Sequence, residues 1–394
     1  MTLSDMDYTK RLESLQNQMR VHNLDAFLVT EPHSIYYLTG ASYEAQERPF
    51  FAIVWSSGNP SFLVPKLEEE HMKKVKIGDV ISYWEYPAPQ GEGWVEKLYE
   101  VLKPGNEVGI EPTVRGTIHE RLIKYNLRPI DLIGTLRLIK SSHELELIRN
   151  AARYADHLMQ LILNNSYYGV SVLELFGLSR KIQIELIKTG TYDPLASSFL
   201  SANWPAPYSA KPHSVPPVYG VLQGGPCVAM SYLRINGYAA ECERTFFLSK
   251  PNQKEIEVFQ DMLAARQIAL DMLRPRVSCH DVDKATYDFL VEKGYKTYLL
   301  HRTGHGIGQD NHEGPYIARG SKQDLEMNMV VSIEPGIYIP EIGGFRHSDT
   351  VLITGSGYEL LTKFPTDLDS LTIKSKKFLK RIKGKIIKGA MGII

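Results

Sequence analysis

The sequence feature that most constrains the fold is an Asn-Gly pair between two runs of strand-forming residues. Residues 227–235 precede Asn236 and Gly237, and residues 238–248 follow them. An Asn-Gly pair in this setting is the strongest short-range signal for a two-residue type I′ turn. The sequence therefore predicts an antiparallel hairpin that begins near residue 227 and ends near residue 248.

The register of this hairpin brings two carboxylates together. Counted outward from the turn, Met230 faces Glu243 and Tyr232 faces Glu241. Side chains two residues apart on a strand share a face, so Glu241 and Glu243 project together about 7 Å apart. Carboxylates this close need water, a cation or a shifted pKa. An edge strand with two solvated glutamates is the alternative, although the apolar residues around them favour a covered strand.

The first third of the chain alternates short β-rich runs with helical patterns. This alternation predicts an α/β N-terminal domain over residues 1–138. Ser141 and Glu144 have the spacing of a capping box that begins a long amphipathic helix, and the domain boundary is placed just before it. Strands are expected at 26–29, 51–55, 61–64, 80–83 and 107–110, and helices near 9–23, 66–76, 93–103 and 116–125.

The second domain is expected over residues 139–366 and has a different layout. After residue 222 its strands follow one another as hairpins, which predicts an α+β domain with an antiparallel sheet backed by helices. Residues 367–394 form a basic tail, with eight Lys and Arg residues and no acidic residue from Lys374 onward. Helices are expected at 143–164, 172–189, 253–273 and 280–294, and further strands near 329–333, 336–339 and 349–354.

Composition narrows the classes of protein and partner. The 394 residues are 43% hydrophobic and 23% charged, as in ordinary globular proteins. The 45 basic residues balance the 45 acidic ones, so net charge favours no nucleic acid partner. The three cysteines form no CxxC pair and no run is long enough to span a membrane, which favours a cytoplasmic protein. The basic tail could contact an anionic membrane surface, but a solvated tail or an added capping helix is the simpler explanation.

Common catalytic motifs are absent, and the remaining polar groups gather in a few segments. The chain has no GxxxxGK[ST] loop, no GxSxG elbow and no HExxH helix. His213 follows a proline, His305 lies in a glycine-rich segment upstream of His312, and Glu334 ends an apolar strand before a Pro-Gly turn. Each of these residues taken singly is more often structural than functional.

Taken together, these segments resemble the pita-bread fold family of creatinase, aminopeptidase P, prolidase and methionine aminopeptidase. Residues 24–27 and 37–40 look like the N-terminal domain of the creatinase and prolidase branch. The segments that resemble the catalytic domain are 237–238, 243–245, 304–308, 312–313, 334–336 and 343–346. The resemblance implies a pita-bread C-terminal domain and an enzyme that hydrolyses C–N bonds.

The metal site that the resemblance implies is altered in this chain. Family metallopeptidases hold two divalent ions with two aspartates, a histidine and two glutamates. His305 and Glu334 keep their ligand type and Glu241 stands at the second aspartate position, whereas Met230 and Ser348 replace the other two carboxylates. A thioether and a hydroxyl are poor ligands for hard divalent ions. No metal is therefore expected, and a single ion (Mn, Co or Zn), if bound, would take Glu241, His305 and Glu334.

Glu243-Arg244-Thr245 resembles the metal-free creatinase branch, in which a glutamate of this segment belongs to the site. The resemblance also implies that His213 is the catalytic histidine. It further implies that Arg48 reaches the active site of the partner subunit in a homodimer. An arginine and a histidine of creatinase correspond to Tyr316 and Ser348 in this chain, so both are replaced. Creatine itself is therefore not the expected substrate.

Hydrolysis without a metal requires side chains that move protons. A positioned base contributes roughly 10²–10⁴-fold, and histidine titrates near neutral pH, so His213 is the predicted proton shuttle. The carboxylates would bind a cationic or N–H-rich substrate, and the other histidines would donate to its carbonyl oxygen. The predicted catalytic residues are His213, Glu243, His305, His312 and Glu334, and the predicted substrate-binding residues are Arg48 and Arg346.

Three functions follow as hypotheses. The first is a creatinase- or prolidase-like hydrolase of a small amidino, ureido or amide substrate without a dinuclear metal centre. The second is a metal-dependent Xaa-Pro dipeptidase or aminopeptidase with an altered, mononuclear site. The third is a non-catalytic pita-bread binding module, which the joint presence of His213, His305, His312 and Glu334 disfavours. The expected partners are a small-molecule or dipeptide-like substrate and a second copy of the chain.

Overall fold

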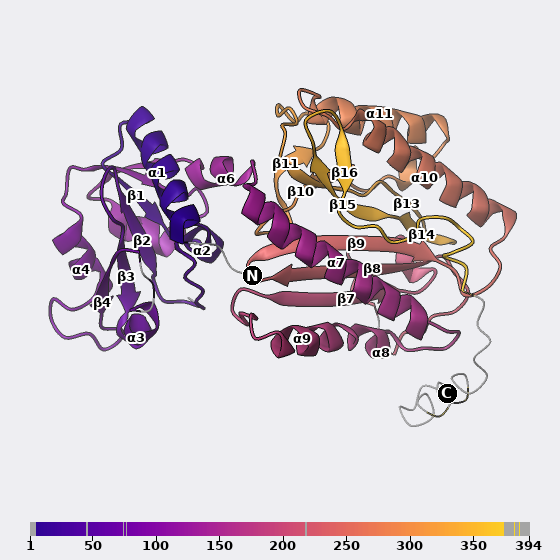
Figure 1. The fold of residues 1–394 in the computed structure, drawn as a ribbon, viewed down its shortest axis with the longest axis horizontal. Helices are drawn as coiled ribbons and strands as arrows, with labels where there is room; N and C mark the ends of the chain where they lie inside the picture. The colour runs from indigo at the N-terminus through magenta and orange to yellow at the C-terminus, as the bar shows by residue number, and fades with distance from the viewer. Residues whose placement is uncertain are drawn as a thin grey trace. The chain divides into compact units, whose positions relative to one another are not determined.

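The computed structural model describes residues 5–44, 46–73, 75, 77–216, 219–373, 382 and 386. The chain divides into two compact units, Met1–Arg137 and Leu138–Ile394, and Figure 1 labels their elements along the chain. Within the described ranges, none of the helices has the length and apolar character needed to cross a membrane. The predicted cytoplasmic location stays a prediction.

The N-terminal unit is built on a six-stranded mixed sheet in the order β4-β3-β2-β1-β5-β6. Central strand β1 (Ala26–Val29) pairs antiparallel with β2 (Phe51–Trp55) and parallel with β5 (Glu107–Ile110). Because successive side chains of β1 point to opposite faces, Phe27 and Val29 join one apolar cluster, and their neighbours on the strand join the other. The predicted α/β arrangement is confirmed.

The remaining elements of this unit are short. Its further strands are β3 (Ser61–Pro65), β4 (Asp79–Tyr83) and β6 (Asn126–Pro129). Its helices are α1 (Asp5–Val21), α2 (Pro32–Thr39), α3 (Glu69–Met72), α4 (Trp94–Val101), α5 (Gly116–His119) and α6 (Leu132–Arg137), with 3₁₀ turns at Lys66–Glu68 and Glu120–Leu122. The helices expected near 66–76 and 116–125 are thus each a 3₁₀ turn joined to a four-residue α-helix.

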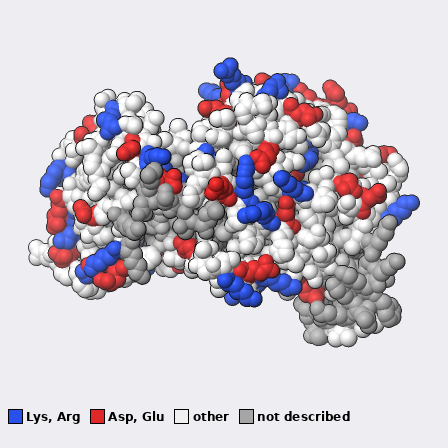
Figure 2. All heavy atoms as spheres, in the orientation of Figure 1, with Lys and Arg blue, Asp and Glu red and all other residues white. Residues whose placement is uncertain are grey.

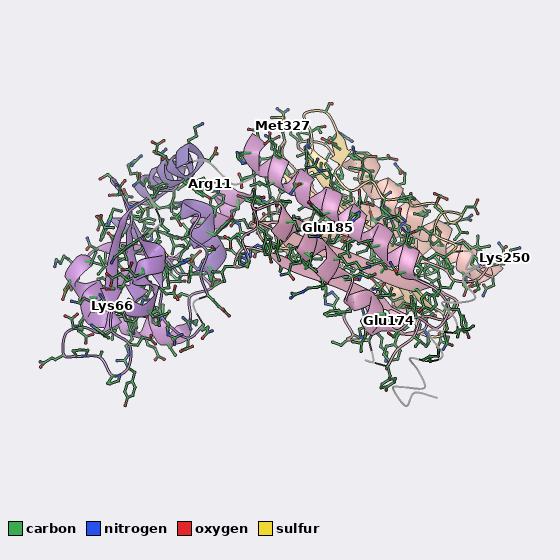
Figure 3. The ribbon with its side chains drawn as sticks, turned by 60° about the horizontal axis from the view of Figure 1, so that its bottom comes forward. Arg11, Lys66, Glu174, Glu185, Lys250 and Met327 are labelled. Carbon is green, nitrogen blue, oxygen red and sulfur yellow. The ribbon has the colours of Figure 1, made fainter. Side chains whose placement is uncertain are left out.

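A buried arginine joins the first two helices. Arg11 of α1, labelled in Figure 3, donates from Nη1 to the carbonyl oxygen of Tyr37 in α2 at 2.7 Å. The same guanidinium lies 4.1 Å from the centre of the Tyr37 ring. A charged group can be buried here because it is both hydrogen-bonded and stacked on an aromatic face.

The C-terminal unit is built on an antiparallel sheet in the order β11-β10-β12-β15-β9-β8-β7, with β16 added beside β15. Helix α7 (Ser142–Asn165) crosses β8 and β9, and α8 (Val172–Phe176) and α9 (Ser179–Lys188) lie beside β7 (Figure 1). The predicted antiparallel sheet backed by helices is confirmed. The other strands are β7 (Ser198–Trp204), β8 (Cys227–Ile235), β9 (Tyr238–Phe246), β10 (Gly304–Gly306), β11 (Glu313–Ile317), β12 (Val330–Ile333), β15 (Ser348–Ile353) and β16 (Tyr358–Leu360).

Further elements complete this unit beyond the main sheet. Among the described residues, strands β13 (Gly336–Ile339) and β14 (Gly343–Arg346) pair with each other and with no further strand. Helices α10 (Gln253–Met272) and α11 (Cys279–Glu292) pack together, and 3₁₀ turns lie at Tyr208–Ala210 and Lys296–Tyr298.

The predicted hairpin is present in the predicted register. Met230 of β8 pairs with Glu243 of β9, and Tyr232 pairs with Glu241. Asn236 and Gly237 have φ values of 48° and 88°, the positive values that a type I′ turn requires at both central positions. The register of the hairpin therefore decides which side chains of β9 share a face.

The capping box is also confirmed, but one predicted helix is wrong. Ser141 Oγ accepts from the backbone N–H of Glu144, and Glu144 accepts from the backbone N–H of Ser141, at the start of α7. The single helix expected over 172–189 is instead the pair α8 and α9, interrupted at Gly177. Glycine has a low helix propensity, which favours the break there.

Arg244 connects β9 to β15 and to the chain beyond β16. Its Nη2 donates to Asp349 Oδ1 and to the Phe364 carbonyl, each at 2.7 Å, and its Nε donates to the Pro365 carbonyl at 2.9 Å. Its Nη1 donates to the carbonyl oxygens of Glu243 and Ser348. All five N–H groups of this fully buried side chain therefore have partners.

Charged side chains of both signs are interspersed over the face that Figure 2 shows. The basic tail predicted for residues 367–394 lies outside the described residues beyond Ile373, apart from Ile382 and Ile386. The membrane contact suggested for that tail therefore stays a prediction.

Candidate active site

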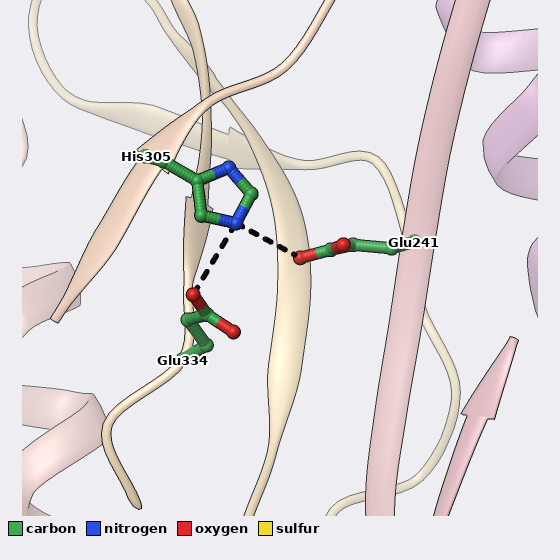
Figure 4. Close-up of side chains that lie close together, drawn as sticks. All are labelled: Glu241, His305 and Glu334. Carbon is green, nitrogen blue, oxygen red and sulfur yellow. Dashed lines mark ion pairs between the residues drawn. The ribbon is translucent and has the colours of Figure 1, made fainter. Parts of the chain in front are cut away.

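Three side chains that can bind a metal converge from β9, β10 and the end of β12 in the large sheet. His305 Nε2 lies 3.2 Å from Glu334 Oε1 and 3.7 Å from Glu241 Oε1 (Figure 4). One ligand atom from each of the three residues lies within 4.8 Å of the others. His305 is fully buried, and Glu241 is 2% exposed. A buried imidazole nitrogen thus faces two carboxylates, which is the donor set of a cation or proton site.

The strands explain why these three residues meet. His305 of β10 pairs with Ser332 of β12, and Glu334 directly follows β12. Gly304 and Gly306 let neighbouring backbones approach closely. A Cβ on Gly304 would lie 2.0 Å from the carbonyl oxygen of Ser332, and a Cβ on Gly306 would lie 1.9 Å from that of Gly314. The glycine-rich segment therefore permits close strand packing that fixes the His305 side chain.

Two serine hydroxyls hold the Glu241 carboxylate. Ser332 Oγ donates to Glu241 Oε1 at 2.6 Å, and Ser348 Oγ donates to the same oxygen at 2.8 Å. Both serines are fully buried. Hydrogen bonds to a charged acceptor are the stronger ones, so the orientation of Glu241 is fixed by its own sheet.

The His305–Glu334 contact shifts the pKa of both groups. Burial lowers the pKa of His305, but the hydrogen bond with Glu334 and the charges of Glu241 and Glu334 outweigh it and raise that pKa to about 9. Burial raises the pKa of Glu334, but the His305 contact outweighs it and lowers that pKa to about 2. Without a metal, the two side chains therefore form a charged pair at neutral pH.

His312 stacks on His305. Their ring centres lie 3.8 Å apart with an angle of 24° between the planes. Burial, followed by the charge of His305, lowers the pKa of His312 to about 4. The Arg302 guanidinium can only donate, so His312 Nδ1 accepts its hydrogen bond at 3.4 Å. Neutral His312 therefore carries its proton on Nε2, where it can donate to a substrate oxygen.

Glu243 forms a buried ion pair with Arg346. Arg346 Nη2 donates to Glu243 Oε1 at 2.7 Å, and its Nε contacts the second carboxylate oxygen. The remaining nitrogen, Nη1, donates to the Tyr338 hydroxyl at 3.1 Å, and that hydroxyl lies 2.7 Å from His301 Nε2. Burial raises the pKa of Glu243 to about 8 together with the charges of Glu241 and Glu334, and Arg346 offsets this only in part.

The structure brings six of the predicted site residues together. Glu241, Glu334 and His312 each contact His305, and Glu243 and Arg346 form an ion pair. His213 is exposed. Burial is the largest cause that lowers the pKa of His301 and of His312, and the charge of His213 adds to it. Arg48 belongs to the N-terminal unit, where its Nε donates to Glu85 Oε2 at 2.6 Å. The catalytic and binding roles of these residues stay predictions.

Sequence reasoning missed three contributors. Ser332 and Tyr338 lie within apolar strands, where a single polar residue gives no signal of a site. His301 lies four residues before His305, and this spacing alone could have drawn attention to it. Ser332 contacts Glu241 across 91 positions and His301 contacts Tyr338 across 37, so neither contact has a local sequence pattern.

Comparison with known proteins agrees with this fold and site. The model of metallopeptidase family M24 matches residues 146–355, and the model of the creatinase/prolidase N-terminal domain matches residues 11–149. The Xaa-Pro dipeptidase of Pyrococcus furiosus is 29% identical over 366 residues, covering 91% of this chain and 99% of that protein. The Xaa-Pro dipeptidase of Lactobacillus delbrueckii subsp. lactis is 28% identical, covering 92% and 99%.

Solved structures give the same result. The recombinant prolidase of Thermococcus sibiricus has a TM-score of 0.84 at 28% identity, covering 94% of this chain and all of that one. The Xaa-Pro dipeptidase of Bacillus anthracis has a TM-score of 0.78 at 26% identity, covering 93% of this chain and all of that one. The predicted two-domain pita-bread fold is therefore confirmed.

The fold and the site define a pita-bread hydrolase that acts on C–N bonds, the class predicted from the sequence. The chain belongs to metallopeptidase family M24, whose model matches more than half of it. The kinship predicted with the metal-free creatinase branch stays a prediction, because the relatives named here are Xaa-Pro dipeptidases and a prolidase.

The donors fit one divalent ion and not two. Glu241, His305 and Glu334 offer two carboxylates and an imidazole, a set of three ligands that leaves room for water or substrate. By the family resemblance, the carboxylates that would complete a second metal site stand at the positions of Met230 and Ser348. The Ser348 hydroxyl instead donates to Glu241. A thioether and a hydroxyl are weak ligands for such ions.

Proposed function

We propose that this chain hydrolyses the C–N bond of a small dipeptide-like substrate at Glu241, His305 and Glu334, with one divalent ion held by these three residues. The observation that carries the proposal is the convergence of the three donors within 4.8 Å in a buried site. The full-length similarity to Xaa-Pro dipeptidases supports the substrate class. The identity of the ion, whether Mn, Co or Zn, is part of the test.

The chain's own residues would orient the substrate and handle its protons. When bound, a divalent ion supplies Lewis acidity and lowers the pKa of water. His312, neutral with its proton on Nε2, would donate to the carbonyl oxygen as negative charge develops there. His213, an exposed residue, would return a proton to the leaving nitrogen.

The charged pair beside this centre limits what the site accepts. Glu243 is occupied by Arg346 on both carboxylate oxygens, so it is neutralised and does not present a bare carboxylate to a guanidino group. An amide or peptide substrate needs no such partner. This arrangement favours a dipeptide-like substrate over an amidino or ureido compound.

Hydrolysis by the purified full chain tests the proposal. Xaa-Pro dipeptides, other dipeptides and N-alkylated guanidino or ureido acids would be offered after EDTA treatment, with and without Mn²⁺, Co²⁺ or Zn²⁺. We expect dipeptide cleavage that EDTA abolishes and one of the ions restores. His305→Ala and Glu334→Gln should each reduce kcat by at least 10²-fold, whereas Glu359→Gln, which removes only a surface ion pair with Arg149, should not.

Two other outcomes would contradict the proposal. Undiminished turnover of a small amide by demonstrably metal-free protein would support the metal-free hydrolase. No turnover of any C–N substrate, together with tight peptide binding, would support a binding module.

A further inference from the structure

A cavity in the N-terminal unit lies where the strand order of its sheet reverses. Strands β1 and β5 are parallel neighbours, and the chain continues from β1 to β2 on one side and from β5 to β6 on the other. In open α/β sheets, ligands bind outside the carboxyl ends of the strands at such a switch point. The cavity has a volume of about 350 Å³, within the range of small-molecule sites.

The ends of both strands contribute to this cavity. Thr30 and Glu31, which directly follow β1, line it together with Arg115, which lies beyond the end of β5. Glu111 ties the two strand ends together, because its Oε2 accepts from the backbone N–H groups of Thr30 at 2.7 Å and of Glu31 at 2.8 Å. The buried Glu111 carboxylate therefore preforms this part of the lining.

The lining carries charges of both signs. The described hydrogen bonds of Glu31 come from its backbone, so its carboxylate is free to meet a ligand, and the exposed Glu44 adds a second carboxylate. Arg115 donates to the carbonyl oxygens of Gln46 at 3.0 Å and of Arg48 at 3.3 Å. A guanidinium has five N–H donors, so further donors remain for a ligand. The cavity thus offers partners for both an ammonium group and a carboxylate.

Tyr43 adds a buried polar atom that the fold leaves unsatisfied. This lining residue is 7% exposed, and its hydroxyl has no hydrogen-bond partner among the residues that the structure describes. Burial raises the pKa of Tyr43, and the nearby charges of Glu111 and Glu31 raise it further, whereas Arg115 lowers it. A buried hydroxyl without a partner costs free energy, and an ammonium group beside Glu31 supplies the donor that it lacks.

The rest of the lining includes an apolar surface. The rings of Tyr43 and Phe50 are stacked, with their centres 3.7 Å apart and an angle of 14° between their planes. Both rings line the cavity, and so do Pro32 and Ile118. Burial of apolar area on this surface stabilises an aliphatic or aromatic side chain.

We infer that this cavity binds a free amino acid with an apolar side chain. The ammonium group binds Glu31 and the Tyr43 hydroxyl, and the carboxylate binds Arg115. The side chain packs on the stacked rings of Tyr43 and Phe50. The site contains none of the residues of the candidate active site, and it goes beyond the proposed function because binding needs neither the ion nor hydrolysis.

Binding of L-leucine to the full chain tests the inference. The protein would be treated with EDTA, so that no added ion takes part, and titrated by calorimetry and by ligand-observed NMR. We expect one L-leucine per chain. Isoamylamine lacks the carboxylate and isocaproate lacks the ammonium group, so each should bind roughly tenfold more weakly or worse.

Substitutions of the two charged residues locate the ligand's charged groups. Glu31→Gln should weaken L-leucine binding roughly tenfold without weakening that of isocaproate, which has no ammonium group. Arg115→Gln should weaken L-leucine binding by a similar factor without weakening that of isoamylamine, which has no carboxylate. This pairing separates a lost contact from a distorted cavity, because distortion would weaken every ligand. The matched control Glu100→Gln removes a surface carboxylate beside Lys97 and should change no affinity.

Two further variants complete the test. Tyr43→Phe keeps the ring and removes only the unsatisfied hydroxyl, so it should weaken L-leucine binding without lowering the temperature of unfolding. His305→Ala alters the candidate active site and should bind L-leucine like the native chain. Circular dichroism would confirm that each variant folds.

Several results would overturn the inference. These are a native chain that binds neither L-leucine nor L-phenylalanine, a folded Glu31→Gln variant with unchanged affinity, and isoamylamine binding as tight as that of L-leucine. Binding lost in His305→Ala but kept in Glu31→Gln would place the amino acid at the candidate active site instead. Hydrolysis is scored separately, so an inactive chain that binds one L-leucine would contradict the proposed function and leave the inference intact.

Discussion

His305 and His312 lie with their rings stacked, 3.8 Å apart, yet their pKa values move in opposite directions. His305 faces two carboxylates, which raise its pKa to about 9, whereas His312 faces His305 and Arg302, and burial lowers its pKa to about 4. One ring of the stack is therefore charged and the other neutral across the physiological range in metal-free protein.

The first prediction concerns the pH dependence of this stack in EDTA-treated protein. The pKa of His305 is raised above 6.5, so its contribution to stability is complete below about pH 6.5 and is lost as the pH rises towards 9. The pKa of His312 is lowered, so stability falls as the pH drops from about 6.5 towards 4. NMR titration, assigned with His305→Asn and His312→Asn variants, should show two separate transitions; a common value near 6.5 would contradict this.

The second prediction concerns Asp349, which accepts from Arg244 and Arg266. Asp349→Ala leaves the buried guanidinium charges of Arg244 and Arg266 without their carboxylate partner and should lower the free energy of unfolding by about 3–5 kcal/mol. The control Asp288→Ala removes a surface pair with Lys284 and should change it far less. Urea unfolding measures the free energy of unfolding of both variants. Equal losses would show that burial of the Asp349 ion pairs is unimportant.

The third prediction concerns the hairpin turn. Gly237 has a φ of 88°, so Gly237→Ala should cost about 1–2 kcal/mol of stability. Gly177 has a φ of −64° and room for a Cβ, whose nearest neighbours would be 3.7 Å away. Gly177→Ala should therefore be neutral or stabilise the protein by about 0.4–1 kcal/mol. Thermal and urea unfolding should show a loss of stability for Gly237→Ala and no loss for Gly177→Ala. A Gly237→Ala protein as stable as the native chain would contradict this prediction.

The fourth prediction concerns His213. If it carries protons, His213→Ala should lower kcat on the substrate found in the screen by roughly 10²–10⁴-fold. Its side chain is exposed, so stability should not change. The exposed His157, which pairs with Glu185 on another surface, gives the matched variant His157→Ala, which should retain activity. Full activity of the His213 variant would remove it from the mechanism.

The fifth prediction concerns the homodimer and the role of Arg48 in it. The structure describes one chain, so both stay predictions. If Arg48 serves the partner's site, Arg48→Ala and His305→Ala are each inactive alone but complement each other when co-expressed. Random pairing then restores about a quarter of native activity, because half of the dimers are mixed and each has one intact site. An active Arg48→Ala protein, or a co-expressed mixture that stays inactive, would refute action across subunits.

Much of the fold could be predicted because its signals are local. The type I′ turn set the register that pairs Met230 with Glu243, and the capping box at Ser141 set the start of α7. The site was less predictable, because its decisive contacts join residues far apart in the chain. Arg346 reaches Glu243 across 103 positions, and Ser332 reaches Glu241 across 91. Neither contact has a local pattern, so the sequence identified charged residues without showing which of them neutralise one another.

The bonds from Arg244 to the carbonyl groups of Phe364 and Pro365 also bear on how the protein is made. On the ribosome, the strand that carries Glu241 and Glu243 is synthesised more than a hundred residues before the segment that completes its anchoring. The N-terminal unit can fold as soon as it emerges, since domains fold as units during synthesis. The large sheet is anchored only after the chain has been synthesised through Pro365, so an ion that binds at Glu241, His305 and Glu334, as proposed, would meet the assembled site only after that point.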